Sequence, residues 1–239
     1  MTVGSALRGA LIDDRDGPLP AMLLALTVLA GVVDAVSILA LDRVFVSSMT
    51  GNLVFIGIGL AGVEGFSVFS PLVSLGSFVL GVLAGAWICR RSGGHRGWAL
   101  RNVTVYKAVL ALPVTVLVLI VGDVLPAGVR TLVIVLLAAS MGGQLALIRY
   151  LKVPDLLTVV LTLTMTGVLT ERAAGRGDPK VIRRGLALAA FTVGVLAGAL
   201  LVRLVSVGAA LTFGLAIILG VGLTIHLLSR REGAWATPR

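Results

Sequence analysis

The chain alternates between long apolar runs and short polar segments. Six apolar runs stand near residues 21–41, 71–89, 105–120, 129–148, 186–202 and 207–228. These lengths approach the roughly 20 residues that cross a bilayer as a helix. The runs are continuous, whereas strands of a membrane barrel would alternate polar and apolar positions. The pattern therefore predicts an all-α polytopic membrane protein with about six spanning helices.

Two further apolar segments, 44–62 and 156–170, are interrupted by polar residues. The first contains Ser-Ser-Met-Thr-Gly-Asn at 47–52, and the second carries Thr at five positions between 158 and 170. Polar, poorly helical backbone is tolerated at bilayer depth only where it is buried in protein or lines a cavity. We therefore expect two discontinuous or re-entrant elements that together form a ligand site.

The sequence also repeats itself. Segment 78–86 (FVLGVLAGA) recurs at 191–199 (FTVGVLAGA), an offset of 113, and Gly31-x-x-x-Ala35 matches Gly142-x-x-x-Ala146 at an offset of 111. Thr50 matches Thr162 at an offset of 112. Three matches in order at nearly constant offset predict a duplication. The predicted organisation is a leader (1–20), repeat 1 (21–125), repeat 2 (126–230) and a tail (231–239).

Charge placement predicts how the chain crosses the membrane. Only 13% of the 239 residues are charged and 58% are hydrophobic, against about 25% charged in soluble domains. If both interrupted segments spanned, the chain would cross eight times, and the Lys and Arg residues would divide 9 to 11 between the two sides. If both segments entered and left on one side, 17 of the 20 would lie on the same side of the membrane. The positive-inside rule favours the second arrangement, with six crossings and both termini cytoplasmic. Three crossings per repeat would make the two repeats inverted.

The net charge of +9 does not indicate a nucleic-acid partner, because the Arg residues flank apolar runs. The single Cys89 excludes an internal disulfide, and His95 and His226 have no partners at metal-ligand spacing. We expect no metal, no cofactor and no catalytic residues. The expected partners are the lipid bilayer, a small polar or anionic solute and, since the chain is small, a second copy in a homodimer.

Several motifs resemble those of the bacterial YoaK-like family of membrane proteins. They are Gly31-x-x-Asp34-Ala35, the run 44–52, Gly142-x-Gln144-x-Ala146 and Thr158-x-x-Leu161-Thr162-x-Thr164. The resemblance covers about residues 20–230 and implies about six spans in a bacterial inner membrane, without implying a substrate. Leu145 and Leu163 stand where the family often has Asn and Gly, so the second half-site is less polar than the family pattern.

Asp34 is the acid that lies well inside a predicted span. An ionisable residue at this depth is costly, by roughly 2.5–3.5 kcal/mol on insertion scales, and is a functional candidate by default. We expect it to bind a coupling proton or cation, or to contact substrate. The alternative is a protonated or hydrogen-bonded structural Asp that pins the Ser/Thr segment.

The predicted substrate-binding residues come from both interrupted elements. They are Ser47, Ser48, Thr50, Gly51 and Asn52 in the first, Thr158, Thr162 and Thr164 in the second, and Gln144 in the span between them. A half-helix starting in the first element would aim free N–H groups at a small polar or anionic solute. The alternative is that these side chains only hydrogen-bond between helices. Lys107, Arg149 and Arg203 are interpreted as span-end residues that reach toward the interface.

Inverted repeats with broken helices are typical of secondary transporters, so the first functional hypothesis is a small transporter with its solute at mid-membrane. This inference from architecture to transport is fold-level analogy. A second hypothesis is a membrane interaction or regulatory protein that does not transport. A third, an intramembrane enzyme, would need a convergent acid, base or metal set, and the sequence offers only Asp34.

Overall fold

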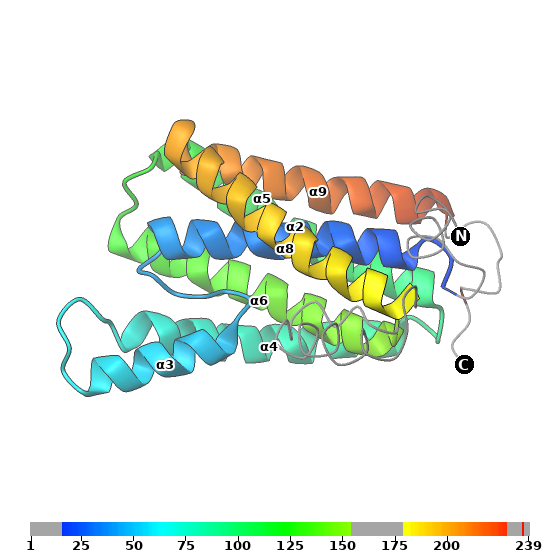
Figure 1. The fold of residues 1–239 in the computed structure, drawn as a ribbon, viewed down its shortest axis with the longest axis horizontal. Coiled ribbons are helices and arrows are strands. Elements are labelled where there is room, and N and C mark those ends of the chain that lie inside the picture. The colour runs from blue at the N-terminus through cyan, green and yellow to red at the C-terminus, as the bar shows by residue number, and fades with distance from the viewer. Residues whose placement is uncertain (1–15, 154–178, 229–235, 237–239) are drawn as a thin grey trace.

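The structure, a computed structural model, describes residues 16–153, 179–228 and 236 (Figure 1). In these residues the chain forms helices and no strands. The helices are α2 (Leu19–Ala40), α3 (Met49–Leu60), α4 (Phe69–Arg91), α5 (Arg96–Val121), α6 (Ala127–Leu151), α8 (Pro179–Leu204) and α9 (Val207–Leu228). Six of them are long and apolar enough to cross a membrane, and α3 is shorter. The prediction of an all-α polytopic membrane protein is confirmed.

Local sequence sets where the helices begin and end. Helix α2 starts beside Pro18 and Pro20, which suit a first turn because their missing N–H groups would be unpaired there anyway. It stops before Asp42 and Arg43, which both have φ of 57° and so leave the helical region. Helix α5 begins at Arg96 and is capped by His95, whose ring accepts a hydrogen bond from the Trp98 N–H.

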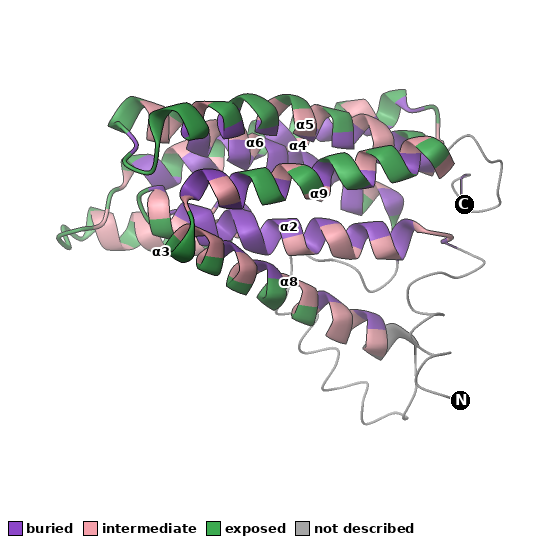
Figure 2. Cartoon of the chain, turned by 90° about the horizontal axis from the view of Figure 1, so that it is seen from above, coloured by how far each residue is buried: buried purple, intermediate pink, exposed green. Residues whose placement is uncertain are grey.

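The long helices lie side by side along the long axis of the molecule. In Figure 1, α2 runs from right to left, whereas α6 beside it runs from left to right. Figure 2 shows α2 mostly buried, while α5, α8 and α9 turn exposed residues outward. Many exposed residues on these outer helices are large and apolar, including Leu119, Leu196 and Leu219. Such a surface suits lipid rather than water.

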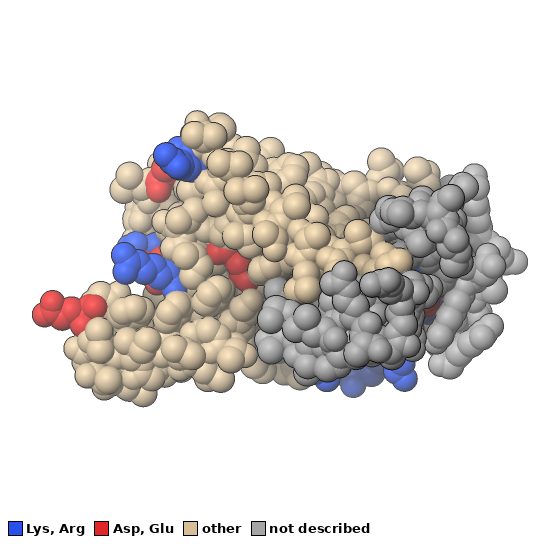
Figure 3. Space-filling model, in the orientation of Figure 1, with Lys and Arg blue, Asp and Glu red and all other residues tan. Residues whose placement is uncertain are grey.

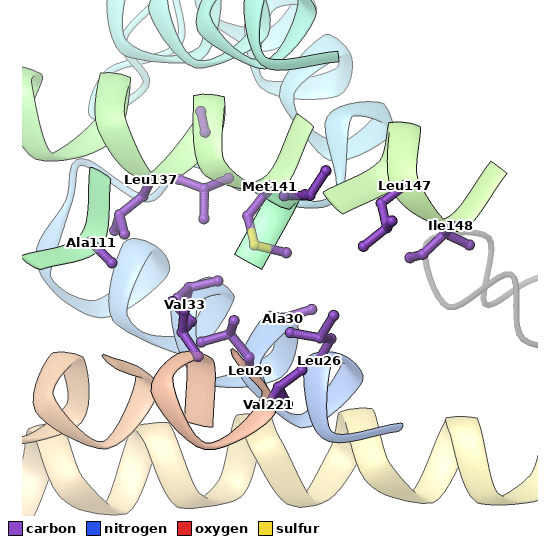
Figure 4. Close-up of a cluster of buried hydrophobic side chains, with 14 of the residues drawn as sticks. Leu26, Leu29, Ala30, Val33, Ala111, Leu137, Met141, Leu147, Ile148 and Val221 are labelled. Carbon is purple, nitrogen blue, oxygen red and sulfur yellow. The ribbon is translucent and has the colours of Figure 1, made fainter. Parts of the chain in front are cut away.

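The centre of the bundle is apolar. Leu26, Leu29 and Val33 of α2 lie in one apolar cluster with Leu137 and Met141 of α6 and Val221 of α9 (Figure 4). This cluster holds the middle helix against its neighbours, and the polar groups described below interrupt it at a few points.

Charged side chains gather toward the two ends of the long axis (Figure 3). One end, which we call the basic end, holds the described residues Arg90, Arg91, Arg96, Arg101, Arg149, Lys152, Arg183 and Arg184. We call the other end the opposite end; it carries Arg43, Arg130 and Arg203 together with Asp42, Glu64 and Asp123.

The two most extensive helix pairs are α4 with α6 and α2 with α8. Both pairs meet through glycines. A Cβ on Gly81 of α4 would collide with the backbone of Ala139 of α6, and a Cβ on Gly194 of α8 would collide with the backbone of Val28 of α2. Small residues at these points let the helix backbones touch.

These contacts match between the two halves of the chain. Gly31 faces the Phe191 carbonyl, and Gly142 faces the Phe78 carbonyl. In the sequence repeat, Gly31 corresponds to Gly142 at an offset of 111, and Phe78 corresponds to Phe191 at an offset of 113. The residues that the sequence repeat relates thus make equivalent contacts, each with the other half of the chain.

The interpretation of Lys107 as a span-end residue is wrong. Helix α5 begins at Arg96, not near 105, so Lys107 lies in its middle and is fully buried. The apolar run alone placed the start too late, because a buried helix can include a lysine that is hydrogen-bonded. Removing Lys107 from the larger set of basic residues leaves 17 less 1, or 16, against 3, so the charge bias persists.

Candidate functional site

The first interrupted segment re-enters the bundle from the opposite end. After α2 ends there, residues 41–48 turn back toward the middle, where α3 begins and runs out to the same end (Figure 1). Helix α3 has 12 residues, or about 18 Å at 1.5 Å per residue, too short for a hydrocarbon core of about 30 Å.

Asp34 holds the inner end of this segment. Its Oδ1 accepts hydrogen bonds from the backbone N–H groups of Val46 (3.1 Å) and Ser47 (2.9 Å). Its Oδ2 accepts from the hydroxyls of Ser47 (2.6 Å) and Ser48 (3.1 Å). A carboxylate offers about four acceptor positions, so four donors fill it. Asp34 is six residues before the end of α2, about 9 Å into the bundle.

Asn52 closes the segment from the other side. Its Oδ1 accepts from the Phe45 N–H at 2.9 Å, and its Nδ2 donates to the Phe45 carbonyl at 2.7 Å. Ser74 of α4 donates its hydroxyl to the same carbonyl at 2.7 Å. The non-helical backbone around Phe45 therefore finds the partners that lipid could not supply.

Gly51 is required by the packing of Phe45. The ring of Phe45 lies so close to Gly51 that any Cβ there would overlap it. The same ring stacks on Phe55, with centroids 5.7 Å apart and an interplanar angle of 7°. Gly51 thus allows the non-helical chain before α3 to lie against α3, which is a packing role.

The outer end of the segment is anchored to two spanning helices. The Asp42 carboxylate pairs with Arg130 of α6 at 2.7 Å and accepts from the Ser70 hydroxyl of α4 at 2.9 Å. These contacts fix where the chain leaves α2. The segment is thus held at both ends, by Asp42 at the surface and by Asp34 inside.

The structure brings Asp34, Ser47, Ser48 and Asn52 together in one hydrogen-bonded cluster. Thr50 differs from them, since it is exposed at the start of α3 and makes no hydrogen bond through its side chain to a described residue. Thr158, Thr162 and Thr164 lie outside the described residues. Whether the second interrupted element faces the first therefore stays a prediction.

Gln144 belongs to a different polar cluster, deeper in the bundle. Its Nε2 donates to the Leu26 carbonyl of α2 at 3.0 Å, and its Oε1 accepts from the Lys107 ammonium nitrogen at 2.6 Å. Lys107 also contacts the Met141 sulfur at 3.5 Å. Both ends of the Gln144 amide are thus occupied by protein, and the residue is fully buried.

Sequence reasoning missed the role of Lys107. The signal that could have found it is the turn at Gly93 and Gly94, which both have positive φ and end the preceding helix. A helix that starts just after this turn and runs through Val121 puts Lys107 near its centre. A buried lysine at such depth is costly and is a functional candidate by the same reasoning as Asp34.

The hydrogen bonds of the Asp34 cluster depend on whether the carboxyl group is ionised or protonated. An ionised carboxylate accepts all four bonds, whereas a protonated one becomes a donor at one oxygen and must give up acceptor capacity there. Protonation of Asp34 would therefore weaken its bonds to Ser47 and Ser48, while the bonds of Asn52 and Ser74 to the Phe45 backbone remain. The cluster as it stands leaves Asp34 no unfilled position for a solute.

Comparisons with known proteins give the family. The family model described as "Protein of unknown function (DUF1275)" matches residues 22–224. The UPF0700 transmembrane protein YoaK of Bacillus subtilis is 32% identical over 155 residues, which cover 64% of this chain and 66% of that protein. The match thus spans slightly less than two thirds of the relative. No solved structure matches the chain significantly. The chain belongs to the DUF1275 family of YoaK-like membrane proteins.

Proposed function

We propose that this protein is a small secondary transporter that binds a small polar solute near the middle of the bilayer, at the inner end of α3. The observation that carries the proposal is a half-helix that begins inside the bundle beside an intramembrane carboxylate. Discontinuous helices of this kind place substrate and ion sites in secondary transporters. The step from this architecture to transport is analogy.

We also propose that the chain is an inverted duplication, with repeats at 21–125 and 126–230. The matched glycine contacts of α2 with α8 and of α4 with α6 support this, as do the opposite directions of α2 and α6. In such a plan the segment 156–170 supplies the second half-site, and Thr158, Thr162 and Thr164 face the solute from it.

The charge of the cluster bears on the class of solute. A helix N-terminus alone favours an anion, but the Asp34 carboxylate already lies at the start of α3. A neutral or positively charged group is therefore the better partner for α3. An anionic group on the solute would have to be bound by the second element.

We propose that Asp34 couples transport to protons by holding or releasing the inner end of α3. Four hydrogen bonds end on this carboxylate, so a change in its protonation state acts directly on how Ser47 and Ser48 are held. The direction of coupling follows: proton binding loosens α3, and proton loss fixes it.

A non-transporting membrane interaction or regulatory protein is the second candidate, and one observation favours it. Asp34, Asn52 and Gln144 are all bonded to protein groups. Side chains that only stabilise the fold would look the same. In that case apolar replacement of Thr50 would leave function intact.

Transport by purified protein in proteoliposomes distinguishes these candidates. We would measure uptake and solid-supported-membrane currents for neutral amino acids, sugars, small amines and small carboxylates. Thr50→Val removes a hydroxyl at the start of α3 that bonds to no described residue, and it should raise KM for the transported solute. Thr131→Val is the matched control, because its hydroxyl is bonded to the Ala127 carbonyl of its own helix. No movement of any solute above empty liposomes would reject transport.

Orientation, location and assembly are proposed with this function. By the positive-inside rule the basic end faces the cytoplasm, which places both termini there in a bacterial inner membrane. The homodimer stays a prediction, and so does the absence of enzymatic activity.

A further inference from the structure

A groove of about 840 Å³ opens between α5 and α9 near the basic end, with α4 at its edge. Its volume lies within the range of about 300–1,000 Å³ that small-molecule sites occupy. It is separate from the Asp34 cluster, since none of its lining residues belongs to α2 or α3. Val105 of α5 and Leu219 and Leu223 of α9 line it and are more than half exposed. The groove therefore opens toward lipid.

The groove is polar at one end and apolar along the rest. Arg101, Asn102 and His226 line the part nearest the basic end, and Val105, Leu219 and Leu223 line the part nearer the middle. Gly222 and Ala108 are the lining residues with the smallest side chains, and a Cβ on Gly222 would meet the Thr104 methyl of α5 at 3.2 Å. The groove could thus contact the charged headgroup of an amphipathic molecule at its polar end and the apolar tail along the rest.

Helix lengths place the polar end at headgroup depth. Helix α5 has 26 residues, about 39 Å at 1.5 Å per residue, against a hydrocarbon core of about 30 Å. Arg101 is five residues from its start, and His226 is two residues from the end of α9. Both therefore lie near the boundary between the hydrocarbon core and the headgroups.

Arg101 has guanidinium capacity left for a ligand. Its Nε and Nη2 donate to the Asn102 Oδ1 at 3.3 and 3.2 Å. In turn the Asn102 amide donates to the Ser92 hydroxyl at 3.2 Å, which fixes its orientation. No described carboxylate pairs with Arg101. A guanidinium has five N–H donors and suits a phosphate with two parallel bonds.

We propose that this groove binds one anionic phospholipid, with the phosphate on Arg101 beside His226 and an acyl chain along Val105, Leu219 and Leu223. Charge complementarity selects this occupant: the head of the groove is cationic and lies at headgroup depth, and its body is apolar. Basic pockets between membrane helices are known to recognise anionic headgroups. This proposal does not depend on transport.

Native mass spectrometry of the full chain in a neutral detergent tests it, with dioleoyl phosphatidylglycerol and dioleoyl phosphatidylcholine as probes. One Arg near the membrane surface contributes enough to give about a fivefold preference for the anionic lipid. Arg101→Gln should abolish that preference. Arg149→Gln is the matched control, an exposed arginine at the same end that does not line the groove, and it should keep the preference.

A second variant guards against a folding defect in Arg101→Gln. Ala108→Leu fills the groove while Arg101 remains, and it should lower the affinity for phosphatidylglycerol severalfold at an unchanged melting temperature. Equal binding of both lipids by the wild type would overturn the proposal. So would an equal loss of preference in the Arg101 and Arg149 variants, or unchanged phosphatidylglycerol binding in Ala108→Leu.

Discussion

The Asp34 carboxylate joins two pieces of backbone that no regular secondary structure could pair. Residues 46–48 are not helical, and the N–H groups of Val46 and Ser47 lie at bilayer depth, where water is scarce. A carboxylate accepts from several donors at once and offers none in return. The hydrogen bonds to Asp34 offset the free-energy cost of a carboxylate inside the membrane, and they fix the point where α3 begins.

Replacing Asp34 should release this segment. Asp34→Ala leaves the Val46 and Ser47 N–H groups unpaired, at about 1–3 kcal/mol each. Asp34→Asn keeps one acceptor oxygen and should cost less. Hydrogen exchange of residues 44–50, followed by mass spectrometry, should accelerate in both variants, more in the alanine variant.

Ser37→Ala is the control for Asp34. Its hydroxyl is also buried on α2, but it donates to the Asp34 carbonyl of its own helix, so exchange of residues 44–50 should not change. Unaltered exchange in Asp34→Ala would show that the carboxylate does not hold the segment.

Lys107 and Gln144 form the second polar pair in the core, and each satisfies the other. Lys107→Met keeps an unbranched apolar side chain, one atom shorter than lysine, but leaves the Gln144 carbonyl oxygen buried without this donor. Gln144→Leu leaves the lysine without its closest acceptor. Each single change should therefore destabilise the fold by about 1–3 kcal/mol.

The double variant Lys107→Met/Gln144→Leu should cost less than the sum of the two single variants, because it removes both partners together. Unfolding in mixed micelles measures all three free energies. Strict additivity would mean that the 2.6 Å contact contributes nothing to the free energy of unfolding.

At the scale of elements, the glycine contacts determine how closely the helices pair. Gly81 of α4 and Gly194 of α8 bring each helix against the backbone of its partner. Without these contacts α2 and α6 would stand further from α8 and α4, and the polar clusters between them would open.

Alanine at Gly81 or Gly194 should push these pairs apart. Overpacking of this kind costs about 1–3 kcal/mol, so each variant should melt at a lower temperature than the wild type. Gly76→Ala is the matched control on α4, because nothing lies within 4 Å of its added Cβ. If Gly76→Ala lowers the melting temperature as much as Gly81→Ala does, the loss cannot come from helix pairing.

At the scale of the whole molecule, hydropathy was enough to predict six spanning helices, because each run of about 20 apolar residues must cross. The polar centre of 44–62 likewise indicated a discontinuous element. The alternative reading of Asp34, a carboxylate that pins the Ser/Thr segment, matches the contacts that the structure has. These features depend on local sequence alone.

What could not be predicted depends on contacts between distant residues. The pairing of Lys107 with Gln144 spans 37 positions, and the bond from Gln144 to the Leu26 carbonyl spans 118. Neither spacing follows a helical period, so no pattern in the sequence reveals it. The bond between the Asn52 amide and the Phe45 backbone spans only seven positions. It was missed for another reason: the sequence does not specify how the non-helical chain before α3 turns.

The central claim is that residues 44–62 enter and leave the membrane on one side, and the sidedness of cysteine labelling tests it most directly. Arg43→Cys and Glu64→Cys, placed singly in a Cys89→Ser background, would be reacted with an impermeant maleimide in sealed vesicles. Gly93→Cys, in the turn between α4 and α5, reports the basic end. We expect positions 43 and 64 to be labelled from the same side and position 93 from the other. Labelling of 43 and 64 from different sides would contradict the re-entrant segment.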